Sequence, residues 1–259
     1  MVARLEGKIA LVTGAASGLG KRMAERFAGE GARVLLTDLN GEGAIAAAAA
    51  IGPNAAGFAH DVTSETQWIA AIAEAKRVFG GLHILVNNAG IGTPGSVEDT
   101  SLDDWRLVHA IDLDGVFLGC KHAIPLIRET TRAEGSRGSI LNISSIAGII
   151  ASGRMAAYNS AKAGVRHLTK SVALHCASKK DAITCNSIHP TFMDTPILDN
   201  FQGAGLTKED VKAKLGRQVP LGVIGEPDDV AWGAVYLCSD EARFVTGAEL
   251  YIDGGISAM

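Results

Sequence analysis

Two side chains in the second half of the chain could together exchange a proton with a substrate. Tyr158 and Lys162 are four positions apart, so on a helix the ammonium group lies on the same face as the phenol. A nearby positive charge favours the phenolate over the neutral phenol. A tyrosine whose pKa is ordinarily about 10 thereby becomes a usable base nearer neutral pH. The pair therefore predicts acid–base chemistry at a hydroxyl or carbonyl group.

A glycine-rich segment near the N-terminus could hold a dinucleotide. Residues 13–20 read TGAASGLG and lie between an apolar run of strand type, 8–13, and a helical pattern over 21–30. A strand, turn and helix in this order aim free backbone N–H groups and the positive end of the helix dipole at a phosphate. The residues expected to contact the cofactor here are Gly14, Ser17, Gly18, Leu19 and Gly20.

An acidic residue ends the next predicted strand. Residues 32–38 close on Asp38, about twenty positions past the glycines, where a carboxylate can accept hydrogen bonds from the adenosine ribose. A 2′-phosphate would meet its negative charge, so Asp38 favours NAD over NADP. Two alternatives stay open: Asp38 is a capping or loop acid, or a basic contact comes from Lys21, Arg22 or Arg33.

Five motifs together resemble the short-chain dehydrogenase/reductase family. They are TGAASGLG, Asp61 in HDVT, NNAG at residues 87–90, Ser145 in NISS, and Tyr158 with Lys162, in the family's order and spacing. The likeness runs from Gly7 to residues 251–255. It implies an enzyme that uses a nicotinamide cofactor to interconvert a secondary alcohol and its ketone by hydride transfer, and Asp38 makes NAD the preferred cofactor.

The resemblance also implies residue roles. Tyr158 would exchange the proton, supported by Lys162, and Ser145 would hydrogen-bond the reacting oxygen and steady its charge. Ser144, next to it, is expected to make a structural hydrogen bond. The other cofactor contacts implied, with Tyr158 and Lys162 among them, are Leu39, Asp61, Val62, Asn88, Ala89, Gly90, Pro190, Met193 and Thr195.

One position departs from the family pattern. Many members have asparagine in a motif of the form NLxGxF, which here reads DLDGVF and begins at Asp112. In the family that residue completes a catalytic tetrad with its backbone carbonyl, so Asp112 joins Ser145, Tyr158 and Lys162 as a candidate catalytic residue. A carboxylate only accepts hydrogen bonds where an amide also donates. Either Asp112 acts through its backbone alone, which we expect, or its charge has been recruited to tune Lys162.

Strand and helix patterns alternate along the whole chain, which predicts an α/β Rossmann fold: a doubly wound parallel β-sheet with helices on both faces. The 259 residues, 47% of them hydrophobic, suffice for one domain over residues 1–259, with a substrate lid at about 191–217. The predicted strands cover residues 8–13, 32–38, 55–60, 83–87, 139–144, 183–188 and 249–252.

Composition argues against several other classes of protein. A net charge of -4 gives no basic surface for nucleic acid or an anionic membrane. The first residues have no signal-peptide core, and the four cysteines are widely spaced, so we expect a cytoplasmic protein with reduced thiols. The seven histidines show no metal-ligand spacing, and we expect no catalytic metal. Apolar residues on more than one face of the helices near 158–176 and 229–238 predict a homotetramer.

The side chains expected above the nicotinamide are apolar, which suits a cyclic, aromatic or steroid-like alcohol better than a sugar or a charged acid. Two other functions remain open: a 3-oxoacyl-thioester reductase using NADPH, and a cofactor-binding protein with little activity. The candidate pocket residues are Ile146, Ile149, Met155, Phe192, Met193, Ile197, Leu198, Phe201 and Leu206.

Overall fold

The computed structural model describes residues 3–196, 198 and 207–259. Its centre is a seven-stranded, all-parallel sheet in the order β3-β2-β1-β4-β5-β6-β7. The strands are β1 (Ile9–Thr13), β2 (Arg33–Asp38), β3 (Ala55–Ala59), β4 (Ile84–Asn87), β5 (Gly138–Ile143), β6 (Ile183–Pro190) and β7 (Glu249–Ile252). Each predicted strand is present, with ends shifted by at most two residues.

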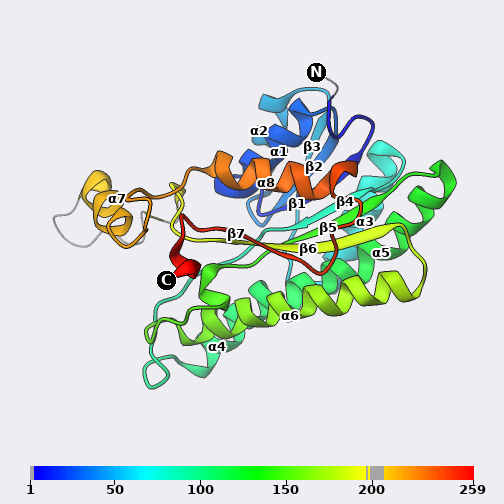
Figure 1. Cartoon of the computed structure of the whole chain (residues 1–259). Helices are drawn as coiled ribbons and strands as arrows, with labels where there is room; N and C mark the ends of the chain where they lie inside the picture. The colour runs from blue at the N-terminus through cyan, green and yellow to red at the C-terminus, as the bar shows by residue number, and fades with distance from the viewer. Residues whose placement is uncertain (1–2, 197, 199–206) are drawn as a thin grey trace.

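Helices cover both faces of this sheet (Figure 1). One layer contains α1 (Gly18–Gly29), α2 (Gly41–Ile51) and α8 (Pro227–Cys238). The other contains α3 (Glu65–Phe79), α4 (Leu102–His109), α5 (Gly115–Glu134) and α6 (Ala156–Ser178). The predicted doubly wound Rossmann architecture is confirmed.

Burial on both faces explains why the central strands lack an alternating pattern. Every residue of β1, β4, β5 and β6 is buried, as expected of parallel strands covered by helices on each side. One apolar cluster joins the sheet to α1 and α8, with Phe27 and Val235 in it, and a second joins it to α3 and α5 around Trp68. This core fixes where each strand ends.

The direction in which successive strands are added to the sheet reverses at β1. The chain winds outward from β1 through β2 to β3, and then crosses to β4 on the other side of β1. Ligands of open α/β sheets bind in the crevice at the carboxyl ends of the strands near such a reversal. The glycine-rich segment follows β1 and residues 87–90 end β4, so these two segments meet at that crevice.

The segment expected to form a lid is described only in part, because Ile197, Phe201 and Leu206 lie outside the described residues. Its described part includes α7 (Lys208–Gly216), which Figure 1 shows set apart from the two helical layers. The side chains of Val211 and Leu215 form a small apolar cluster with Leu198, Phe192 and Ile224. This cluster attaches α7 to the chain that follows β6.

Candidate active site

The glycine loop has a shape that only glycine permits. Gly14 and Gly18 have positive φ angles of 62° and 55°, in the left-handed region that other residues rarely adopt. A Cβ on Gly20 would lie 2.5 Å from Asn88 Nδ2 and closer still to the carbonyl oxygen of Gly14. Ser17 precedes the first turn of α1 and makes no side-chain cap with it. The first N–H groups of α1 can thus receive a pyrophosphate.

A hydrogen-bond network ties the end of β4 to the glycine loop. Thr13 Oγ1 accepts hydrogen bonds from the backbone N–H groups of Asn88 and Ala89, both at 3.0 Å. The Asn88 amide in turn donates to the carbonyl oxygens of Thr13 at 2.8 Å and Gly14 at 3.1 Å. The side chain of Asn88 therefore holds the loop in place, a role that the sequence did not indicate.

Asp38 also faces the glycine loop. It ends β2, and its carboxylate accepts hydrogen bonds from the N–H groups of Ala16 at 3.0 Å and Asn40 at 2.9 Å. It does not cap a helix, because Asn40 caps α2. Asp38 thus lies where the sequence predicted it, at the carboxyl end of the second strand.

The next strand ends with the residues expected near an adenine ring. Asp61 Oδ1 accepts hydrogen bonds from the N–H and hydroxyl groups of Thr63 at 2.9 and 2.7 Å, while Ser64 caps α3. Val62 is almost buried, whereas Leu39, which follows neighbouring β2, has 77% of its surface exposed. An exposed leucine at this edge offers an apolar surface to a planar ring.

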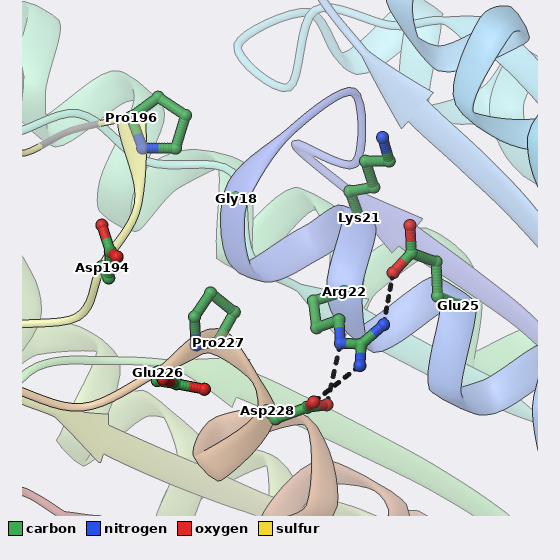
Figure 2. A pocket seen from close by; sticks show the side chains of 9 residues that line it. All are labelled: Gly18, Lys21, Arg22, Glu25, Asp194, Pro196, Glu226, Pro227 and Asp228. Carbon is green, nitrogen blue, oxygen red and sulfur yellow. Dashed lines mark hydrogen bonds and ion pairs between the residues drawn. The ribbon is translucent and has the colours of Figure 1, made fainter.

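Two of the three basic residues near Asp38 in sequence, Arg22 and Arg33, have other partners. Arg22 of α1 binds the Asp228 carboxylate of α8 and also Glu25 (Figure 2). Arg26, also of α1, binds the same Asp228 carboxylate. These contacts raise the pKa of Arg22 and lower that of Asp228. Arg33 begins β2, at the opposite end from Asp38, and donates to the carbonyl of Phe79. Lys21 lines the pocket of Figure 2 together with Gly18.

The acid–base candidates come from β5 and α6. Ser145 follows β5, is 9% exposed, and its hydroxyl accepts a hydrogen bond from the N–H of Ala147. Tyr158 and Lys162 lie in the first two turns of α6, with the lysine Nζ 5.6 Å from the centre of the tyrosine ring. The predicted helical spacing of this pair is confirmed, and it sits beside the end of β5.

Lys162 is buried and has several polar neighbours. Its Nζ donates to the carbonyl oxygen of Ile143 at 3.1 Å, and its own carbonyl oxygen accepts from the Ser144 hydroxyl at 2.9 Å. Ser144 therefore makes the structural hydrogen bond expected of it. A Cβ on Gly148 would lie 2.8 Å from the Lys162 carbonyl group, so the segment after β5 packs directly on α6.

The side chain of Asp112 also reaches Lys162. Asp112 lies in a five-residue π-helical turn, Ala110–Asp114, that joins α4 to α5. Its Oδ2 is 3.1 Å from Lys162 Nζ, and its Oδ1 accepts from the N–H of Ile91 at 2.8 Å. The expectation that Asp112 takes part through its backbone alone does not describe this contact, because the buried carboxylate itself touches the lysine.

The charge of Lys162 depends on these neighbours. Burial by itself disfavours the ammonium form, but the Asp112 carboxylate and Tyr158 favour it, and the net result is a pKa of Lys162 above its ordinary value. Lys162 is therefore a cation at neutral pH.

The chain after β6 closes the site from the other side. Pro190 is the last residue of β6, and Thr195 follows with a hydrogen bond from its N–H to the Met193 carbonyl at 2.8 Å. A Cβ on Gly18 would lie 3.7 Å from the Thr195 side chain. The residues expected to hold the nicotinamide carboxamide are thus next to the glycine loop.

Three of the candidate pocket residues pack against other parts of the chain. Phe192 and Leu198 belong to the apolar cluster with α7, whereas Met193 belongs to the core cluster of the sheet and its sulfur lies against Gly225. Met155 lies across from residues 92–95, through a bridge between its backbone and that of Gly95. Ile146, Ile149 and Met155 are partly exposed and remain the better candidates for substrate contact.

A buried histidine lies behind Ser145, and its contact with that serine was not predicted from the sequence. His189 of β6 has its Nδ1 3.2 Å from the Ser145 carbonyl oxygen and its Nε2 2.8 Å from the Ser187 hydroxyl. Burial lowers the pKa of His189, so the ring is neutral and can donate from Nδ1 while accepting at Nε2. Its position two residues after Ser187, one residue beyond the predicted strand 183–188, was the available signal.

Among residues 3–196, 198 and 207–259, no group of three or more His, Cys, Asp and Glu side chains is placed to hold a metal ion. No described helix is long and apolar enough to cross a membrane.

Comparison with known proteins agrees with this geometry. A family profile described as "Enoyl-(Acyl carrier protein) reductase" matches residues 14–257. The chain is 40% identical over 260 residues to the NADP-dependent (R)-specific alcohol dehydrogenase of Lentilactobacillus kefiri, with all of both chains covered. It is 41% identical over 259 residues to a 3-alpha-(or 20-beta)-hydroxysteroid dehydrogenase of Mycobacterium bovis, covering all of this chain and 92% of the relative.

A solved structure is similar over the whole chain. The ligand-free aldohexose dehydrogenase of Thermoplasma acidophilum matches with a TM-score of 0.88 and 33% identity, covering 100% of this chain and 97% of that one. The chain belongs to the short-chain dehydrogenase/reductase family.

The glycine loop generates a first prediction. Gly20→Ala should weaken NAD binding about tenfold or more, because the new methyl group overlaps Asn88 and the Gly14 carbonyl and must displace the loop. Gly29→Ala, in the same helix but with open space around the new Cβ, is the matched control and should leave binding unchanged. Fluorescence titration with NADH measures both. Equal affinity of the two variants would contradict this account of the loop.

Proposed function

We propose that this protein is a dehydrogenase that interconverts a secondary alcohol and its ketone with NAD, using Tyr158 as the acid–base group. The observation that carries the proposal is the position of Tyr158 beside the buried Lys162 ammonium, at the edge of the sheet where the glycine loop also lies. The relatives named alcohol and hydroxysteroid dehydrogenases support this class of reaction.

In this proposal each side chain has one task. Ser145 donates its hydroxyl hydrogen bond to the substrate oxygen, while Tyr158 removes the alcohol proton in oxidation and returns it in reduction. Lys162 favours the phenolate form of Tyr158 by its charge. Bound NAD would supply the acceptor for the hydride that leaves the alcohol carbon. The glycine loop, Asp38 and residues after β6 would hold that cofactor.

The preference for NAD rests on charge. Asp38 ends β2 as a carboxylate facing the glycine loop, and it would repel a 2′-phosphate. Arg22 is engaged by Asp228 and Glu25, and Arg33 lies at the far end of β2, so neither is placed to neutralise such a phosphate. The Lentilactobacillus kefiri relative is NADP-dependent by its name. In this proposal the chain differs from that relative in cofactor preference.

We further propose a cyclic or steroid-like alcohol as substrate. Ile146, Ile149 and Met155, partly exposed beside Ser145 and Tyr158, provide an apolar wall without a charged group of their own. The hydroxysteroid dehydrogenase of Mycobacterium bovis supports this class. The aldohexose dehydrogenase of Thermoplasma acidophilum makes a sugar the main competitor. Turnover of steroid and cyclic alcohols well above that of aldohexoses would support the proposal, and the reverse order would contradict it.

We also propose that the chain forms a homotetramer in the cytoplasm, where its four buried, free cysteines would stay reduced. An apolar groove runs between α5 and α6, lined in part by Phe117, Leu168 and Val172. On α8, Trp232 and Tyr236 are 41% and 37% exposed. The pair α5 and α6 and the single helix α8 thus each leave apolar surface after covering the sheet, which suits two separate two-fold contacts.

The tetramer generates a second prediction. Light scattering at micromolar concentration should give the mass of four chains, because two separate apolar contacts join four copies into a closed assembly. Phe117→Glu should reduce that mass by weakening the contact through the groove between α5 and α6. Val97→Glu, at an apolar residue that is more exposed than Phe117 and lies outside both helices, is the control and should leave the mass unchanged. A monomer for the unaltered protein would refute the assembly.

Removing the proposed base is the third prediction. Tyr158→Phe keeps the ring but deletes the hydroxyl, so turnover should fall by ~10²- to 10⁴-fold while affinity for NADH changes little. Tyr236→Phe, on α8, removes a phenol outside the site and should retain full turnover. Steady-state kinetics with a responsive alcohol measures both. Turnover of Tyr158→Phe within tenfold of the unaltered protein would overturn the role of this residue.

Cofactor choice is the fourth prediction. Asp38→Ser removes the repulsion of a 2′-phosphate and should narrow the ratio of kcat/KM for NAD over NADP by about tenfold or more, equivalent to about 1.4 kcal/mol. Glu42→Ser removes the same charge from an exposed site in the first turn of α2 and should leave the ratio unchanged. If the unaltered protein already uses NADP faster than NAD at equal concentration, the charge argument fails.

A further inference from the structure

The Asp112 and Lys162 side chains form a buried ion pair at the centre of the site. The Oδ2 to Nζ distance is 3.1 Å, and the two side chains are 0% and 5% exposed. Gly90 leaves the room for it, since a Cβ there would lie 3.1 Å from Asp112 Oδ2 and 3.2 Å from Lys162 Nζ. Water therefore screens the two charges little, and each acts on its surroundings with the other beside it.

The backbone holds the carboxylate in this place. The π-helical turn Ala110–Asp114 carries Asp112 between α4 and α5, and the N–H of Ile91 anchors Oδ1 at 2.8 Å. Turns of this kind occur frequently at functional sites. An asparagine of the same shape could occupy this place, but it would bring no charge to Lys162. The pKa of Asp112 lies above its ordinary value, because burial outweighs the Lys162 charge and the Ile91 hydrogen bond, which both favour the carboxylate. The negative charge at this place comes from the residue type at position 112 rather than from the shape of the site.

We propose that Asp112 is a positioning residue that offsets part of the positive charge of Lys162, so that Tyr158 loses its proton at higher pH than it would beside an unpaired lysine. This inference rests on the proposed role of Tyr158 as the base. Two opposite charges in contact produce a weaker field at a third group than the cation alone. The pair would then set the pH range of alcohol oxidation.

The other groups around this part of α6 are few. His109 at the end of α4 has its Nε2 2.8 Å from the Ser160 hydroxyl, and neutral His189 of β6 lies behind Ser145. Asp114 shares the π-helical turn but is exposed. β5 and the short 3-10 helix Ile146–Gly148 carry no titratable side chain. Arg128 of α5 binds Asp181, which follows the far end of α6.

A competing effect has the opposite sign. If the main effect of Asp112 were to keep the buried Lys162 protonated, removing its charge would neutralise the lysine and make Tyr158 a weaker acid. Lys162 retains the Ile143 carbonyl at 3.1 Å and the nearby Tyr158 in either case. Because these partners also favour the ammonium form, we expect Lys162 to stay charged without Asp112.

The fifth prediction tests the sign of this effect. In the pH profile of kcat/KM for alcohol oxidation with NAD, the rise in activity marks deprotonation of the base. Asp112→Asn keeps the size of the side chain and removes its charge, so this rise should move to lower pH by about one unit, within the ~1 to 3 units that a neighbouring charge can produce. Asp114→Asn makes the same charge change at a solvent-exposed residue of the same turn. It should move the rise in activity along the pH axis by far less.

A second measurement does not depend on turnover. The ionisation of Tyr158 can be followed directly by tyrosinate absorbance. The absorbance of Tyr158→Phe is subtracted from that of the unaltered protein, and the absorbance of the double variant Tyr158→Phe/Asp112→Asn is subtracted from that of Asp112→Asn. The chain has only three tyrosines, which keeps this difference clear. A midpoint that moves to lower pH in Asp112→Asn supports the proposal even if no alcohol tested is oxidised, in which case only the proposed function fails.

Three results would overturn the proposal. A shift to higher pH would show that Asp112 acts mainly by keeping Lys162 charged. An unchanged midpoint would show that the carboxylate has no effect on Tyr158. A shift of equal size in Asp114→Asn would mean that only the overall charge of the protein is being sensed. A loss of turnover in Asp112→Asn with the midpoint unmoved belongs to the second of these results.

Discussion

The buried ammonium group of Lys162 is the constraint around which the site is organised. A buried cation must have polar partners, and here the Ile143 carbonyl and the Asp112 carboxylate provide them. Meeting that need brings together the end of β5, the turn between α4 and α5, and the first turns of α6. Gly90 must stay small for the same reason. Tyr158 receives its position because it shares the helical face of this lysine.

A second network gives the cofactor side of the site its rigidity. Thr13 and Asn88 exchange four hydrogen bonds with one another and their neighbours across β1 and β4, the two strands on either side of the topological reversal. The glycine loop is thereby fixed to the sheet before any ligand arrives. Such preorganisation lowers the cost of ordering the loop on binding. Asp38 adds a third attachment through the N–H of Ala16.

Much of the fold could be predicted from the sequence because its signals are local. Apolar runs bounded by turn residues mark all seven strands, and the spacing of Tyr158 and Lys162 places both on one helical face. The glycine loop could also be predicted, since its need for small residues is visible in the residue types alone. These features depend on neighbours within a few positions along the chain.

The remainder depends on contacts between distant segments. Nothing in residues 110–114 distinguishes a π-helical turn from an ordinary helix, and its geometry brings Asp112 onto a lysine fifty positions away. The amide of Asn88 likewise donates to the carbonyl oxygen of Gly14, a partner so distant along the chain that the sequence does not reveal it. Phe192 and Leu198 read as pocket residues because they are apolar, but α7 supplies the surface on which they pack.

The most direct test of the account as a whole is to follow the hydrogen that leaves the alcohol. A secondary alcohol carrying deuterium on its carbinol carbon should transfer that deuterium to NAD, and its oxidation should be slowed relative to the undeuterated alcohol under single-turnover conditions. The proton on oxygen should exchange with solvent through Tyr158. Recovery of the label in NADH would agree with direct hydride transfer in this site. Appearance of the deuterium in water instead would contradict the account.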